Sequence, residues 1–163
     1  MKKLVATVLG VALVASAATS FPWSKKAKGK TTGGKVLNIA VWNDEFPARF
    51  EKYYKSKVPA GVKVNFIQTP NQGNAYQNKL DEALLAQNSA AADEKIDMFL
   101  MEADYADKYV NSSYILDVKD LGITDSDTAQ MYDYTKTIAT DSSNKLKALS
   151  WQATPGLYAY RND

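Results

Sequence analysis

The sequence of 163 residues contains no histidine and no cysteine. It therefore cannot form a Ser-His or Cys-His nucleophilic pair, a zinc site with His or Cys ligands, an iron–sulfur cluster or a disulfide. It also has no G-x-G-x-x-G motif or P-loop, the common signatures of nucleotide binding. We expect no metal site and no cofactor, so that any catalysis would depend on carboxylates, lysine, tyrosine or hydroxyl groups.

Acidic residues are missing from the N-terminal part of the chain. All 18 lie at or beyond Asp44, whereas seven of the 20 basic residues lie at or before Lys35. From Val36 onward the chain therefore has 13 basic and 18 acidic residues, which gives it a net charge of −5. A mildly acidic domain argues against nucleic-acid binding, which needs a basic face.

The first 35 residues have the pattern of an export signal and a tether. Lys2 and Lys3 precede a charge-free apolar run from Leu4 to Ala15, and Ala15-Ser16-Ala17 has the small residues of a cleavage site. We expect a signal peptide over residues 1–17, or alternatively an uncleaved anchor, and hence secretion to the extracellular face of the membrane or the periplasm. The polar, basic composition of residues 18–35 predicts a flexible linker.

Short apolar runs and amphipathic stretches alternate after residue 35. We expect helices that begin near Asp44, near Tyr76, at Asp104 and at Thr124, where a capping box would start a helix to about Ile138. The predicted strands cover residues 36–42, 62–68, 96–101, 146–151 and 157–161. This alternation predicts an α/β fold with a doubly wound, mainly parallel sheet.

Ligands of such sheets bind beyond the carboxyl ends of the strands. This rule selects Trp42-Asn43-Asp44, the loop from Thr69 to Asn74, and the segment from Glu102 to Tyr105. The Trp42 indole could stack on a ligand while Asn43 and Asp44 hydrogen-bond its edge. Alternatively, Trp42 belongs to the core and the two polar residues cap a helix.

Two further groups allow the same pair of interpretations. Glu102, Asp104 and Asp107 could bind a cation or act as general acid and base, or could simply be acids at a helix N-terminus. Trp151 and Gln152 precede a Pro-Gly turn and could bind a ligand or form an ordinary loop. Asn111-Ser112-Ser113 is a formal glycosylation sequon.

The string LSWQATPGLYAYRND, residues 149–163, resembles the lobe-to-lobe crossover of extracellular solute-binding proteins of carbohydrate ABC transporters. The first strand with its exit, the Ile96-Asp97-Met98 strand with Glu102 to Tyr105, and the stretch from Tyr132 to Trp151 extend the resemblance over about 125 residues. It implies a periplasmic-binding-protein-like first lobe over residues 36–152. Residues 153–163 would begin the hinge crossover to a second lobe, so the chain resembles the N-terminal portion of the family.

The resemblance implies a non-catalytic, monomeric protein that binds a sugar or oligosaccharide and delivers it to permease subunits in the membrane. Carried over by position, the ligand contacts are Trp42, Asn43, Asp44, Glu102, Asp104, Trp151 and Gln152.

The chain departs from the family in lacking a lipobox cysteine, which excludes a lipid anchor of that type. Asn144 also replaces a common turn glycine, but asparagine tolerates the left-handed conformation. Two alternatives remain open. They are a secreted glycoside hydrolase using Glu102 with Asp104 or Asp107, and the ligand-sensor domain of a receptor.

Overall fold

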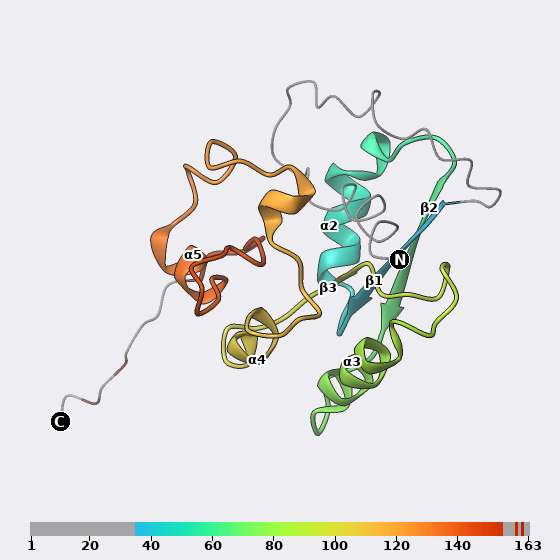
Figure 1. Cartoon of the computed structure of the whole chain (residues 1–163), viewed down its shortest axis with the longest axis horizontal. Helices are drawn as coiled ribbons and strands as arrows, with labels where there is room; N and C mark the ends of the chain where they lie inside the picture. The colour runs from blue at the N-terminus through green and yellow to red at the C-terminus, as the bar shows by residue number, and fades with distance from the viewer. Residues whose placement is uncertain (1–34, 155–158, 160, 162–163) are drawn as a thin grey trace. The chain divides into compact units, whose positions relative to one another are not determined.

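The computed structural model describes residues 35–154, 159 and 161 (Figure 1). The chain forms two compact units, of which the first ends at Glu102 and the second begins at Ala103. Each unit is described by itself. The signal peptide and nearly all of the linker predicted before residue 35 lie outside the described residues, and the first lobe predicted over residues 36–152 draws on both units and remains a prediction.

Three parallel strands form the sheet of the first unit, in the order β2-β1-β3. The central strand β1 (Lys35–Val41) pairs along its whole length with β2 (Val62–Gln68) and over two residues with β3 (Met98–Phe99). Ile39 is opposite Phe66 on one side and Met98 on the other. The structure therefore confirms a mixed α/β fold with a small parallel sheet.

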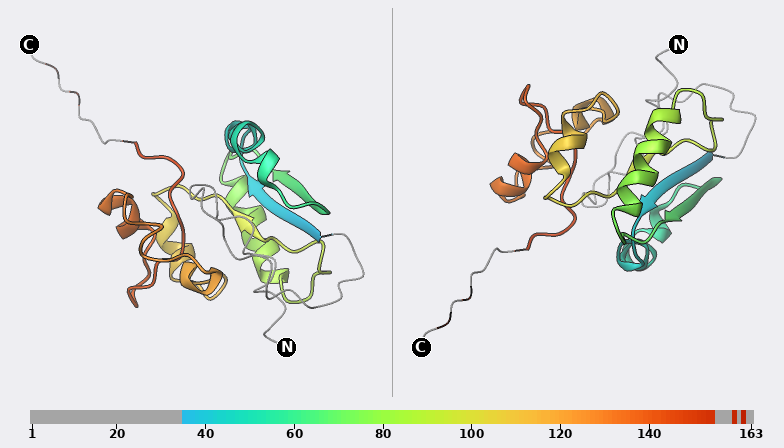
Figure 2. Two further views of the ribbon diagram at one scale, coloured as in Figure 1. Left: turned by 90° about the horizontal axis from the view of Figure 1, so that it is seen from above. Right: turned by 90° about the horizontal axis from the view of Figure 1, so that it is seen from below.

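Helices α2 (Glu45–Tyr53) and α3 (Ala75–Ala86) cover opposite faces of this sheet (Figure 2). Right-handed crossovers from β1 to β2 and from β2 back past β1 to β3 require that placement. On the α2 face, the Phe50 ring packs edge-on against Phe66 at 5.5 Å. On the other face, Tyr76, Leu80 and Leu84 of α3 are buried, and the Tyr76 hydroxyl contacts the Ala40 carbonyl of β1.

Helix α2 does not bury all of its aromatic side chains. Phe50 is buried, but Tyr53 is 60% exposed and has the Lys52 ammonium 5.1 Å from its ring centroid. The chain then continues through the 3₁₀ helix η2 (Lys55–Lys57), and Gly61 adopts the left-handed φ of 81° before β2 begins.

Strand β3 is shorter than the predicted strand over residues 96–101. A side chain replaces the ladder at its start, because the backbone N–H of Asn38 donates to the Asp97 carboxylate at 2.8 Å. The Asp97 N–H donates to the Asn38 carbonyl at 3.0 Å, and the Leu100 N–H donates to Ala40 at 3.1 Å. Backbone pairing thus extends beyond the two residues with regular strand geometry.

The second unit contains short elements joined by turns. They are α4 (Ala106–Val110), the 3₁₀ helix η3 (Val118–Leu121) and α5 (Asp133–Ile138). Its interior is formed by Tyr109, Val110, Val118 and Ile123, all buried.

Two predictions for this unit are wrong. The predicted helix from Thr124 to about Ile138 forms only in its last part, as α5. The segment from Thr124 to Met131 instead forms successive i→i+3 turns. Half of the predicted capping box is present, because the Thr124 N–H donates to the Asp127 carboxylate at 2.7 Å. The Thr124 hydroxyl also donates to this carboxylate, whereas the Asp127 N–H donates to the Thr124 carbonyl and not to the hydroxyl, as a capping box requires. Residues 146–151 form no strand but a single antiparallel bridge between Thr140 and Leu146. Most of the strand predicted at residues 157–161 lies outside the described residues.

Candidate functional site

The carboxyl ends of β1 and β3 meet where the order of the sheet changes direction. The chain passes from β1 to β2 on one side and from β2 across β1 to β3 on the other. A doubly wound sheet opens a crevice for ligands at such a point. Because Ala40 is opposite Phe99 in this parallel pair, Trp42 and Glu102 follow the carboxyl ends of β1 and β3 on the same side of the sheet. Sequence and topology therefore select the same place in the first unit.

Tyr76 fixes the geometry of this switch point. Its side chain is 1% exposed, and its hydroxyl donates to the Leu100 carbonyl at 2.7 Å, with the Ala40 carbonyl at 3.1 Å. The phenol thereby connects the exit of β1 to the exit of β3. Its ring also packs edge-on against Trp42, with centroids 5.4 Å apart and planes at 75°. The indole is only partly buried, so part of it remains accessible beside this support.

Asn43 and Asp44 differ in how the structure uses them. The Asn43 side-chain oxygen accepts the Glu45 N–H at 3.0 Å, which is the predicted capping role. Asp44 occupies the N-cap position of α2, but its side chain makes no capping hydrogen bond and is exposed. The bond at the helix start therefore explains the presence of Asn43. The Asp44 carboxylate lies just beyond the carboxyl end of β1 and has no capping role.

The loop from Thr69 to Asn74 lies at the same edge. The Thr69 N–H donates to the Val41 carbonyl at 2.9 Å, so the chain leaves β2 beside the end of β1. Gly73 and Asn74 then adopt consecutive left-handed conformations, with φ of 56° and 62°. These two residues turn the chain into α3 and bring Tyr76 to the switch point.

The predicted acidic cluster is divided by the boundary between the units. Glu102 is exposed at the end of the first unit, and Asp104 is exposed at the start of the second. Asp107 accepts the Asn111 carboxamide N–H at 2.8 Å. Among the described residues, no group of three or more acidic side chains is arranged to hold a metal ion.

Asn111 of the formal sequon has a structural role. Its carboxamide donates to the carboxylate and carbonyl of Asp107, and its oxygen accepts the Ser142 N–H at 2.9 Å. It thereby joins the end of α4 to the turn at residues 141–145. A glycan would replace one hydrogen of this nitrogen and so remove one of its two bonds to Asp107.

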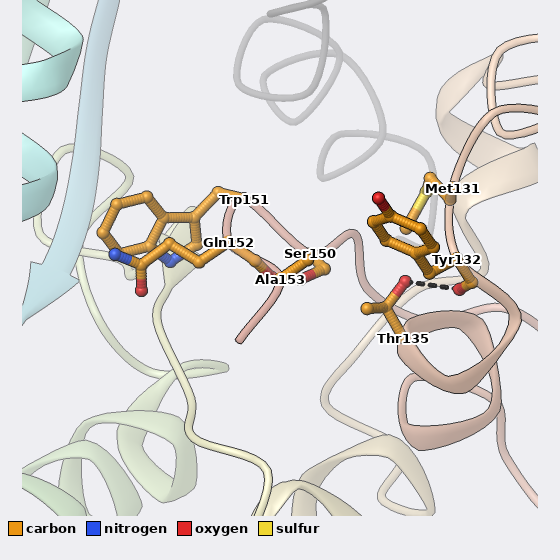
Figure 3. Close-up of a pocket in the computed structure, with 7 residues that line it drawn as sticks. All are labelled: Met131, Tyr132, Thr135, Ser150, Trp151, Gln152 and Ala153. Carbon is orange, nitrogen blue, oxygen red and sulfur yellow. Dashed lines mark hydrogen bonds between the residues drawn. The ribbon is translucent and has the colours of Figure 1, made fainter. Parts of the chain in front are cut away.

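Trp151 and Gln152 line a cavity of about 180 Å³ in the second unit (Figure 3). The same cavity is lined by Met131, Tyr132, Thr135, Ser150 and Ala153. Figure 3 shows the indole and the Gln152 carboxamide directed away from Tyr132 and Thr135. The sequence analysis selected Trp151 and Gln152 but not Tyr132, which lies at the N-cap position of α5.

Two carboxylates with shifted pKa values lie at the start of β3 and in the turn at residues 141–145. Burial raises the pKa of Asp97 above its ordinary value, against the opposing effect of the Asn38 hydrogen bond. Hydrogen bonds from backbone N–H groups, first that of Lys145, lower the pKa of Asp141. Both carboxylates hold backbone segments, which indicates structural roles.

Comparison of the chain with protein-family models, curated proteins and solved structures returned no match. In the part of the chain that the structure describes, no helix combines the length and apolar character needed to cross a membrane.

Proposed function

We propose that the chain is a secreted substrate-binding protein that captures a sugar or oligosaccharide for import by an ABC transporter. One observation carries the proposal more than any other. A partly accessible indole, held edge-on by a buried tyrosine, lies where a parallel sheet changes direction. Aromatic rings bind the C–H face of a sugar, and neighbouring carboxylates and amides bind its hydroxyl groups.

In this proposal the sheet belongs to a periplasmic-binding-protein-like lobe, as the sequence resemblance implies. Trp42 provides the stacking surface of the first unit, and Asp44 and Glu102 accept hydrogen bonds from sugar hydroxyls. Asn43 uses its side-chain oxygen in a capping bond, so its contribution to ligand is its NH₂ group. Asp104, Trp151 and Gln152 lie in the second unit, and their role as ligand contacts is what the sequence resemblance implies.

The proposal also assigns the setting. The protein acts at the extracellular face of the membrane or in the periplasm, as a monomer, and passes its ligand to permease subunits. It requires no metal or cofactor, because stacking and hydroxyl recognition need neither.

Calorimetric titration of the chain with neutral oligosaccharides tests this function. Trp42→Ala should weaken binding by about tenfold, as expected when an aromatic stacking surface is removed. Tyr53→Ala is the matched control, because Tyr53 is an exposed aromatic residue of the same unit outside the switch point. Absence of saccharide binding would contradict the proposal. Turnover of the oligosaccharides that is abolished by Glu102→Gln would instead identify a glycoside hydrolase.

A further inference from the structure

The cavity of the second unit is built by two chain segments that are separated in sequence. Met131, Tyr132 and Thr135 come from the start of α5, and Ser150 to Ala153 from the C-terminal part of the described chain. The Tyr132 carbonyl accepts the Thr135 hydroxyl at 2.7 Å, which fixes the first turn of α5. The Ser150 hydroxyl donates to the Gln152 carbonyl and fixes the opposite segment. In Figure 3, Ser150 faces Tyr132 and Thr135 across the gap.

Tyr132 presents an unusually open aromatic surface. Its side chain is 67% exposed, and its ring stacks on Tyr134 with centroids 6.1 Å apart and planes at 20°. Tyr134 packs against one part of Tyr132 and leaves most of the side chain open to a ligand. An exposed aromatic surface of this kind can pack against the flat apolar face of a sugar ring.

The lining carries no charge. None of the seven residues that line the cavity is Lys, Arg, Asp or Glu. The nearest charged side chains on α5 neutralise each other, because Lys136 pairs with Asp133 at 2.9 Å. The lining includes the hydroxyls of Thr135 and Ser150, which keep acceptor lone pairs after donating their protons. Such a lining suits an uncharged ligand with hydroxyl groups.

The volume of about 180 Å³ limits the size of the ligand. It is smaller than the roughly 300–1,000 Å³ of pockets that enclose a drug-sized molecule. One six-membered sugar ring fits this scale, whereas an enclosed oligosaccharide does not.

We propose that this cavity is a subsite for one uncharged pyranose ring, with Tyr132 as its stacking surface. The inference rests on the proposed carbohydrate-binding function and adds to it. It places a ring contact in the second unit that is independent of Trp42, and it makes neutral sugars the preferred class. Trp151 is directed away from Tyr132, so the ring stacks on one face only.

The test compares three variants of the full chain by calorimetry with neutral trisaccharides such as maltotriose, cellotriose and mannotriose. Tyr132→Ala should weaken binding of the trisaccharide that the unmodified chain binds by about five- to tenfold. Tyr132→Phe should bind within about twofold, because the ring and not the hydroxyl carries the contact. Tyr114→Ala, which removes an exposed tyrosine of the same unit outside the cavity, should bind like the unmodified chain.

The outcomes separate this subsite from the function on which it rests. If the unmodified chain binds a trisaccharide and Tyr132→Ala binds it equally well, the subsite is refuted and the carbohydrate function stands. If the unmodified chain binds no trisaccharide, both fail. A trigalacturonate that binds as tightly as the neutral sugars would overturn the preference for uncharged rings. Circular dichroism of Tyr132→Ala should match that of the unmodified chain, because the side chain is mostly exposed.

Discussion

The two units of this chain keep their structure by different means. The first contains a parallel sheet with a helix on each face, and the central strand places Leu37, Ile39 and Val41 in its interior. The second has three short helical elements, and many of its connections are bonds from side chains to backbone. The first unit thus rests on a sheet covered on both faces, whereas in the second, side-chain bonds connect short elements around an apolar interior.

This difference explains where each unit can present a ligand surface. In the first, the crossovers of the sheet create an edge at which Trp42, Asp44 and Glu102 emerge together. In the second, the turns leave aromatic side chains such as Tyr132 exposed beside a small cavity. The following substitutions test the comparison.

The largest effect is expected in the central strand. Ile39 is fully buried, so Ile39→Ala should lower the free energy of unfolding by about 2–5 kcal/mol. The same change at Ile138, which is 39% exposed in the second unit, should cost less than about 1 kcal/mol. Urea denaturation followed by circular dichroism measures both. Equal losses would contradict the contrast between the two units.

The next effect concerns the turn that Asp141 holds. Its carboxylate accepts the N–H groups of Ser143 and Lys145 at 2.9 Å and pairs with Lys147, whose side chain is 12% exposed. Asp141→Ala should accelerate hydrogen exchange of these two amides by about tenfold while leaving the amides of β1 unchanged. Asp120→Ala, an exposed acid of the same unit, serves as control.

The pKa of Asp141 gives this turn a pH dependence. Because the folded-state pKa is lowered, the stabilisation is fully present above the ordinary value of 3.8 and is lost as the pH falls below it. Exchange at the two amides should therefore approach that of Asp141→Ala in strong acid. Protection that persists unchanged there would refute the role of the carboxylate.

A smaller effect is expected at Asn144, whose φ is 60°. Asn144→Ala should cost about 1 kcal/mol, because alanine has no side-chain bond that favours the left-handed conformation. Asn144→Gly should change the free energy of unfolding by less than about 0.5 kcal/mol, since glycine adopts this conformation without strain. Thermal melts of both variants measure the pair, and an alanine variant as stable as the glycine variant would rule out this source of strain.

The smallest effect is expected at Asp97. Its folded-state pKa is raised by burial, so the ionised carboxylate destabilises the fold above that pKa, and the cost disappears as the pH falls through it. Asp97→Asn should therefore raise the melting temperature slightly at pH 7, and the gain should shrink toward pH 4. Asp93→Asn, an exposed neighbour, should give no gain that depends on pH in this way. A gain at Asp97 that grows in acid would reverse the assignment.

The sequence predicted the first unit more completely than the second. Strand Val62–Gln68 begins and ends at the predicted residues, and β1 and α3 differ from the prediction by one or two positions. Apolar periodicity is informative there because the sheet buries one side of each helix. The predicted left-handed conformation of Asn144 is also confirmed.

The errors have a common physical origin in side chains that replace backbone partners. Asp97 takes a ladder bond and shortens β3, and the polar run after Thr124 prefers separate turns to a continuous helix. Tyr76 was predicted only as the approximate start of a helix, because its bond to the Leu100 carbonyl joins residues 24 positions apart in the sequence. Tyr132 could not be identified for the same reason, since its cavity needs the distant segment at residues 150–153.

The indole N–H signals of the three tryptophans provide the most direct test of carbohydrate capture at the switch point. Each signal can be assigned by substituting Trp23, Trp42 or Trp151 with Phe, and the full chain can be titrated with a neutral oligosaccharide. The account predicts a saturable shift of the Trp42 signal that Asp44→Asn weakens. A bound oligosaccharide that leaves the Trp42 signal unmoved at saturation would contradict it.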